Sequence, residues 1–290
     1  MTSVSYSVLD NTLPDGARHL SGAVAAARLR EDAIPYCGAF TEDVLRQVIS
    51  DNQAVQSLPE AQSDSIPDKN YIYMLTQGYR DIRSLVAGLY VGFQDYDYYT
   101  LDHLQPEDAD RLYTLRTQNL MTWLDSEDIN LSPVKQQFLI DRYNALETPM
   151  TYHPYNGWES ISEYAPTLLM VMTFLIGFLV AGIFAREKQH KADAIFYSTY
   201  HGRKKAVWAK VKAGLVITNG AFWTCTLVYS GVLLLLLSAS GWDTPIQFQN
   251  WKSFYNITML QRYLLMVLGG WVSVNFISLL CMLVSAKTNS

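Results

Sequence analysis

The chain has 290 residues, and its averages resemble those of a soluble protein, with 17% charged residues, a mean hydropathy of +0.02 and a net charge of −5. These averages conceal two unlike halves, since residues 1–163 hold 24 acidic and 11 basic side chains (net −13) and residues 164–290 hold 3 acidic and 11 basic (net +8). This change in charge predicts an acidic soluble domain joined to a basic, apolar membrane part, and it disfavours nucleic acid as a partner. The three cysteines are too few for a disulfide framework.

Turn and capping signals divide the acidic half into helices. Thr41 can cap a helix whose first turn carries two acids, Glu42 and Asp43, and Pro106 stands at the first position of another. A polar loop is expected over residues 59–70. Strand alternation is weak throughout, so a mostly α-helical domain is expected. The expected helices cover residues 42–58, 71–92, 106–124 and 133–146.

Three local clusters in this half allow either a functional or a structural interpretation. A cluster of aromatic residues could form a ligand surface or pack at the edge of the core. A cluster of acids could form a metal site or an exposed acidic face. A segment with a histidine and a tryptophan could form a gate or a turn at the membrane interface. Packing, exposure and interfacial anchoring are the favoured interpretations. The clusters are Tyr90, Phe93, Tyr96, Tyr98 and Tyr99; Asp95, Asp97 and Asp102; and His153 with Trp158.

Three apolar runs follow, and none contains Asp, Glu, His, Lys or Arg. At about 1.5 Å per residue, roughly 20 helical residues span the hydrocarbon core of a bilayer, which is about 30 Å thick. A buried helix of a soluble protein rarely stays uncharged for more than about 18 residues. The sequence therefore predicts membrane helices over residues 166–185, 213–240 and 263–286.

The charges of the connecting segments predict the orientation. Residues 186–212 hold eight basic and two acidic side chains, whereas residues 241–262 hold two basic and one acidic. The positive-inside rule places residues 186–212 and the C-terminus in the cytoplasm, and residues 1–163 and 241–262 outside. Residues 1–20 lack the basic and apolar regions of a signal peptide, so we expect a further membrane helix upstream and treat the chain as a fragment.

Three motifs of common enzyme classes are absent from the sequence. The sequence has no G-x-x-x-x-G-K-[ST], H-E-x-x-H or G-x-S-x-G, and its five histidines are scattered. Spans without ionisable groups disfavour ion-coupled transport. We expect no bound metal or cofactor and no catalysis, but a subunit driven by another protein. Neutral polar and small residues are expected to join the helices, namely Asn219, Asn275, Ser230, Ser273, Gly177, Gly182, Gly269 and Gly270.

The segment between the first two spans combines several short patterns. An acidic residue follows the span, a small-residue turn and Gly-Arg come next, and Ala-Lys enters the following span. These pieces are Glu187, Asp193–Ile195, Ser198, Gly202–Arg203, Val207 and Ala209–Lys210. By charge alone the segment also suits a basic amphipathic helix on a lipid surface. Together with residues 38–49 and 150–169, it resembles the permease subunits of bacterial exporter-type (type 2) ABC transporters that carry a large external domain.

The resemblance implies an all-α membrane protein of the bacterial plasma membrane, with an extracytoplasmic domain over 1–163 and a transmembrane domain over 164–290. Of the six spans usual in such permeases, this chain would hold the second to the fourth. Its partners would be a separate ABC ATP-binding subunit, a second permease copy or related permease, and the lipid bilayer. The residues that would contact the ATPase are Glu187, Asp193, Gly202, Arg203, Lys204 and Lys210.

Two other classes remain open. A membrane-anchored sensor or scaffold would use the acidic domain to bind a ligand outside and would need no ATPase partner. A membrane enzyme is the weakest alternative, because neither the spans nor their ends present a paired acid and base or a nucleophile set.

Overall fold

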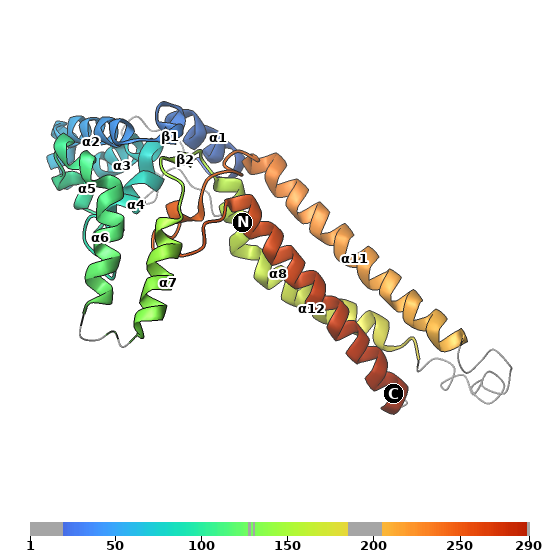
Figure 1. Ribbon diagram of the computed structural model, residues 1–290. Helices are drawn as coiled ribbons and strands as arrows, with labels where there is room; N and C mark the ends of the chain where they lie inside the picture. The colour runs from blue at the N-terminus through green and yellow to red at the C-terminus, as the bar shows by residue number, and fades with distance from the viewer. Residues whose placement is uncertain (1–19, 127–128, 130, 185–204, 289–290) are drawn as a thin grey trace. The chain divides into compact units, whose positions relative to one another are not determined.

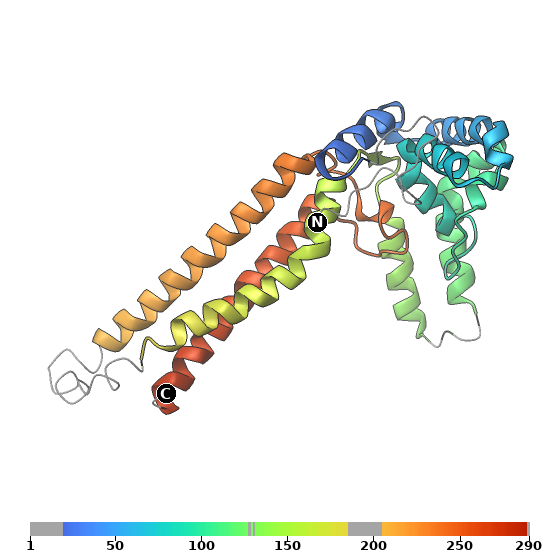
Figure 2. The same cartoon turned by 180° about the vertical axis from the view of Figure 1, so that it is seen from behind.

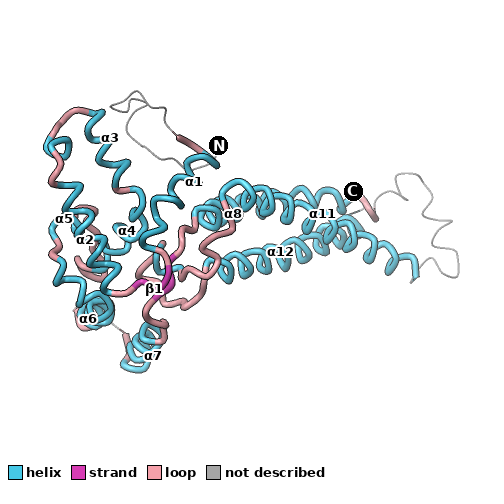
Figure 3. Tube along the Cα trace, turned by 90° about the horizontal axis from the view of Figure 1, so that it is seen from above, coloured by secondary structure: helices cyan, strands magenta, loops and turns pink. Residues whose placement is uncertain are grey.

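The computed structural model describes residues 20–126, 129, 131–184 and 205–288, and most of them are helical, as predicted (Figure 3). The described residues form two compact units. The first unit comprises those of Met1–Ser160 and Leu235–Arg262, and the second comprises those of Ile161–Leu234 and Tyr263–Ser290. The segment between the last two long helices, which the sequence analysis assigned to the membrane part, thus belongs to the first unit.

The first unit is built from short helices. They are α1 (Gly22–Ala33), α2 (Glu42–Gln56), α3 (Ile66–Leu75), α4 (Arg80–Leu89), α5 (Thr100–His103), α6 (Leu112–Leu124) and α7 (Pro133–Asn144) (Figure 1). The start of α2 follows the predicted cap, because the Thr41 hydroxyl accepts a hydrogen bond from the Val44 N–H at 3.4 Å. Its Leu45, Val48 and Ile49 are fully buried, so one face of this helix forms part of the core.

The single helix predicted over residues 71–92 is wrong. The structure has two helices there, α3 and α4, separated by a 3₁₀ turn at Gln77–Tyr79, and α3 begins inside the predicted loop. The Ser65 hydroxyl accepts a hydrogen bond from the Asp68 N–H and starts α3 early. At the turn, Gly78 lies so close to the Asp32 carbonyl that a Cβ atom would clash with it. Packing against α1 therefore overrides the helical pattern.

A pair of short strands joins two distant parts of the first unit. Strand β1 (Gly38–Phe40) pairs antiparallel with β2 (Met150–Tyr152) (Figure 1). In this register Ala39 lies opposite Thr151. The Tyr113 hydroxyl from α6 donates to the Phe40 carbonyl and accepts from the Met150 N–H, so it ties both strands to a helix. Three-residue strands leave no alternation to detect, which is why the sequence did not predict them.

The aromatic core of the first unit includes residues from the segment between α11 (Lys205–Leu237) and α12 (Met259–Thr288). Phe93 packs against Trp123 and Trp251, with ring centroids 4.7 and 5.5 Å away. The Tyr143 hydroxyl donates to the Trp251 carbonyl at 3.3 Å. The predicted core packing of the aromatic cluster is therefore confirmed for Phe93, whereas Tyr96, Tyr98 and Tyr99 are exposed.

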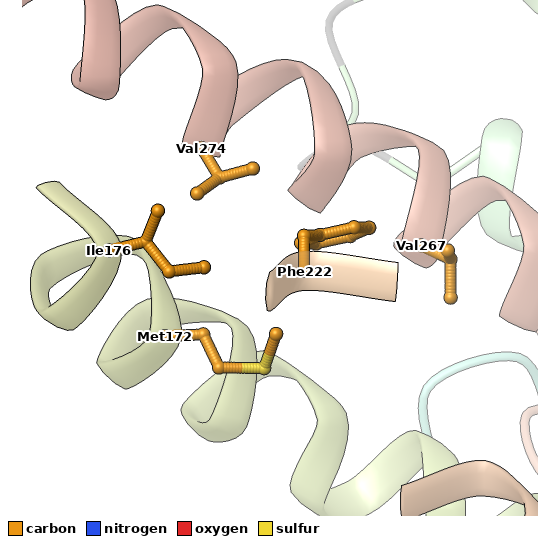
Figure 4. Packing of buried hydrophobic residues seen from close by; sticks show 5 residues of the cluster. All are labelled: Met172, Ile176, Phe222, Val267 and Val274. Carbon is orange, nitrogen blue, oxygen red and sulfur yellow. The ribbon is translucent and has the colours of Figure 1, made fainter. Parts of the chain in front are cut away.

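Three long helices, α8 (Asn156–Ala181), α11 and α12, make up the second unit, and each is long and apolar enough to cross a membrane. Helices α8 and α12 run side by side, and α11 runs in the opposite direction (Figures 1 and 2). Their shared core is a cluster of five buried side chains, Met172 and Ile176 from α8, Phe222 from α11, and Val267 and Val274 from α12 (Figure 4).

Candidate functional site

The predicted coupling segment lies mostly outside the described residues. Glu187, Asp193, Gly202, Arg203 and Lys204 all fall there. Lys210 is described and lies near the start of α11, and its Nζ atom is 5.3 Å from the ring centroid of Phe184, which follows the end of α8. A cation–π contact thus joins the two helices at the ends of the segment that connects them.

The second unit contains a polar contact network between α11 and α12. The Asn219 Nδ2 atom donates to Asn275 Oδ1 at 3.0 Å, and the Trp271 indole N–H donates to Asn219 Oδ1 at 2.6 Å. Asn275 Nδ2 also donates to the Trp271 carbonyl of its own helix at 2.9 Å. The predicted role of Asn219 and Asn275 in joining helices is confirmed. Trp271 was missed, although an indole in the middle of an apolar run needs an acceptor.

Two further contacts through hydroxyl groups lie nearer the end of α11 and the start of α12. The Ser230 hydroxyl of α11 contacts the Tyr263 hydroxyl of α12. The Tyr229 hydroxyl of α11 donates to the Ile161 carbonyl of α8 at 3.2 Å. Ser230 was predicted to join helices, whereas Ser273 bonds only to the Gly269 carbonyl of its own helix among its hydrogen bonds to described residues. The three helices are therefore joined by neutral polar groups as well as by apolar packing.

Helices α8 and α12 approach each other closely at some of the glycines for which close packing was predicted. A Cβ atom at Gly270 would lie 2.7 Å from Leu169 Cδ2, and one at Gly177 would lie 3.3 Å from Cys281 Sγ. Gly214, which was not predicted, lies against Met282. For Gly182 and Gly269 no described atom beyond the neighbouring backbone lies within 4 Å of such a Cβ, so the described residues show no close packing at these two positions.

Charged side chains of the second unit lie at the ends of its helices. The described stretches 164–184, 213–237 and 263–286 contain no Asp, Glu, His, Lys or Arg. Lys205, Lys210 and Lys212 lie at the start of α11, and Lys287 lies at the end of α12, which is the same end of the bundle (Figure 1). One end of the helical bundle is therefore basic.

The first unit holds a buried polar cluster that the sequence did not reveal. Arg83 on α4 is 2% exposed, and its guanidinium donates to Asp102 Oδ1 at 2.9 Å and to Asn52 Oδ1. The predicted exposed acidic face is therefore correct for Asp95 and Asp97 and wrong for Asp102, because Asp102 is ion-paired and largely covered. In the sequence, the only local sign of this buried cluster is an arginine that lies between the apolar residues Ile82 and Leu85.

The histidine–tryptophan segment takes part in local packing of the first unit. The Trp158 indole N–H donates to the Ala239 carbonyl at 3.1 Å, and the His153 N–H donates to the Thr244 hydroxyl at 2.9 Å. His153 Nδ1 lies 3.3 Å from Asp243 Oδ1. Among the residues that the structure describes, no group of three or more His, Cys, Asp or Glu side chains is placed to hold a metal ion.

Comparisons with known proteins add no identity, since no family model, no curated protein and no solved structure matches the chain.

Proposed function

We propose that the chain is the membrane-spanning permease subunit of a bacterial exporter-type ABC transporter. In this role it couples ATP hydrolysis on a separate ATPase subunit to the movement of a substrate across the plasma membrane. The observation that carries the proposal is the make-up of the second unit. Its three membrane-length helices are joined by amides, hydroxyls and close glycine contacts, and the described parts of the spans contain no acid or base at membrane depth.

As a transporter, a helical bundle of this composition would need an outside source of energy. Ion-driven transporters keep ionisable groups within the membrane to bind the coupling ion, and such groups are absent from the described spans. The sequence also has no phosphate-binding loop of its own. Conformational work must therefore enter through a partner, and the basic segment 186–212 is the place where we expect the ATPase to dock.

The contact of Lys210 with Phe184 supports this coupling role. The contact lies between the end of α8 and the start of α11, so in the proposed role a displacement of the connecting segment would act on both helices. The amide pair of Asn219 with Asn275 then links α11 to α12. Packed helices joined in this way move as rigid bodies, which is the motion that alternating access requires.

The exposed surface of the three helices fits further membrane partners. Only 22–28% of the residues in their most apolar stretches are buried within the chain. The remaining apolar surface suits lipid and the helices of a second permease. The basic end formed by Lys205, Lys212 and Lys287 fits a cytoplasmic location, with the first unit on the opposite side of the membrane.

The experiment is affinity purification of the full chain, in its native gene context, from mild detergent, with partners identified by mass spectrometry. A stoichiometric P-loop ATPase is expected. Glu187→Ala and Arg203→Glu should lose the ATPase while still inserting in the membrane. Lys252→Glu, which changes a basic residue outside the coupling segment, should retain it. If the ATPase is absent, or if both coupling variants retain it, the proposal is wrong.

The alternative function is a membrane-anchored sensor or scaffold. The observation that favours it is a cleft in the first unit, bordered by Tyr98 and Tyr99. A sensor would bind its ligand there and would purify without an ATPase, so the same experiment separates the two functions.

A further inference from the structure

A cleft of about 290 Å³ opens on the surface of the first unit, between α3, the segment after α2, and the residues around α5. This volume is close to the lower limit for clefts that bind small molecules. The side chains that line it come from parts of the chain up to 46 residues apart. They are Gln56, Glu60, Ala61, Lys69, Ile72, Tyr73, Thr76, Arg83, Tyr98, Tyr99 and Asp102.

Aromatic rings form one wall of the cleft. The rings of Tyr98 and Tyr99 stand perpendicular, with centroids 5.6 Å apart and an interplanar angle of 90°. Tyr98 is 36% exposed and Tyr99 is 64% exposed, so both side chains are accessible to a ligand. Tyr73 on α3 adds a third aromatic side chain. Perpendicular aromatic faces attract cations, because the face of each ring is the negative part of its quadrupole.

The floor of the cleft is fixed by the buried polar cluster. Asp102 Oδ1 accepts hydrogen bonds from Arg83 at 2.9 Å, from Asn52 at 2.8 Å and from Gln56 at 3.3 Å. The Arg83 guanidinium also lies 5.1 Å from the ring centroid of Tyr98, so it holds that ring in place from within. The cleft is therefore pre-formed, which reduces the conformational entropy lost when a ligand binds.

The charges around the cleft leave one acid uncompensated. Arg83 is paired with Asp102, and Lys69 is paired with Asp64 at 2.9 Å. Within the described parts of the chain, Glu60 has no ion-pair partner. The first 163 residues also carry a net charge of −13, which adds a long-range field that attracts cations.

We propose that this cleft binds a small organic cation with an apolar body. The ammonium group lies beside the Glu60 carboxylate and the face of Tyr99, and the apolar body lies against Ile72 and Tyr73. The proposal does not depend on the function proposed above, because either a transporter or a sensor can carry such a site.

Calorimetric titration of the full chain in detergent with three matched probes tests the charge preference. Tryptamine, tryptophol and indole-3-propionate share one ring and differ in charge. Tryptamine is expected to bind at least about tenfold more tightly than the other two. Equal affinities for the three probes, or no heat of binding with tryptamine, would overturn the proposal.

Two pairs of variants locate the site. Tyr99→Ala should weaken tryptamine binding about fivefold, whereas Tyr96→Ala, which removes a similarly exposed tyrosine outside the cleft, should leave it unchanged. Glu60→Gln should weaken binding about threefold or more, and Glu107→Gln should not. If each variant and its control have the same effect, the cation binds elsewhere and the assignment fails.

Discussion

The side chains of Asn219 and Asn275 face each other across α11 and α12, with the amide nitrogen of Asn219 3.0 Å from the amide oxygen of Asn275. A side-chain amide in an apolar bundle is costly unless its donors and acceptors are satisfied. Here the Trp271 indole N–H donates a hydrogen bond to the side-chain oxygen of Asn219, so this acceptor is satisfied as well. Three polar groups therefore satisfy one another within a cluster that has no charge, and they fix the register of the two helices.

Removing this pair should weaken the bundle. Asn275→Leu is expected to lower the free energy of unfolding by about 1 kcal/mol, because hydrogen bonds between membrane helices contribute about 0.6 kcal/mol on average and up to about 1.7. Unfolding in mixed micelles, followed by tryptophan fluorescence, measures the change. Ser273→Ala is the control, since the Ser273 hydroxyl bonds within α12. Equal losses in both variants would contradict a role for the amide pair.

Adjacent glycines of α12 should respond in opposite ways to an added methyl group. Gly270→Ala is expected to destabilise the bundle by about 1 kcal/mol, because the new Cβ would lie 2.7 Å from Leu169 Cδ2. At Gly269 the new Cβ would have no described atom within 4 Å apart from the neighbouring backbone of α12, so Gly269→Ala should be neutral or stabilising, since alanine favours helix. The same unfolding assay compares the two. A larger loss at Gly269 than at Gly270 would mean that α8 and α12 pack differently.

Buried and exposed arginines of the first unit should differ in how much they contribute to its stability. Arg83→Met is expected to cost about 3 kcal/mol, because it leaves Asp102 and Asn52 without their charged partner in a covered site. Arg46→Met removes the ion pairs with Asp43 and Asp110 at the surface and should change stability little. Urea unfolding followed by circular dichroism checks both. Similar effects of the two variants would show that the Arg83 pair is open to water.

Alkaline pH should destabilise the first unit through Tyr143. Burial raises the pKa of Tyr143 to about 12, although the nearby Arg116 guanidinium opposes the shift. The folded state holds this proton more tightly than the unfolded state, whose tyrosine pKa is about 10. Its contribution to the free energy of unfolding, about 3 kcal/mol, is therefore fully present below about pH 10 and is lost as pH rises from 10 to 12.

The check is urea unfolding of the full chain at several pH values between 8 and 11.5. Tyr143→Phe keeps the ring against Phe93 and removes the titrating hydroxyl, so the decline above pH 10 should become shallower. The urea concentration at the midpoint of unfolding, measured below pH 9 where tyrosine is neutral, is the control. It reports the loss of the hydrogen bond from the Tyr143 hydroxyl to the Trp251 carbonyl. An unchanged slope would assign the alkaline loss to other groups.

The parts of the fold that follow from composition could be predicted from the sequence. Membrane-length helices need only a long uncharged run, so all three were found, and the start of α2 followed from the single cap at Thr41. Asn219 and Asn275 were identified because a polar residue in an apolar helix needs a partner. Each of these inferences uses information that lies within one turn or one helix of the residue concerned.

The parts that depend on distant residues could not be predicted. The break between α3 and α4 results from contact of Gly78 with Asp32, and the pairing of β1 with β2 joins three residues to three others more than 100 positions away. The ion pair of Arg83 with Asp102 forms across two helices, so the apolar neighbours of Arg83 indicate its burial but not its partner. Nothing in the local pattern records which residues meet in space.

Trp251 also imposes an order on biogenesis. It lies in the core of the first unit, 108 positions after Tyr143, and α8 and α11 lie between them in the sequence. During synthesis the ribosome must complete both of these long helices before this side chain emerges. Until then the nascent domain exposes the site that Trp251 fills beside Phe93 and Gly88. We expect this late closure to delay the final folding of the first unit until the segment after α11 has been synthesised.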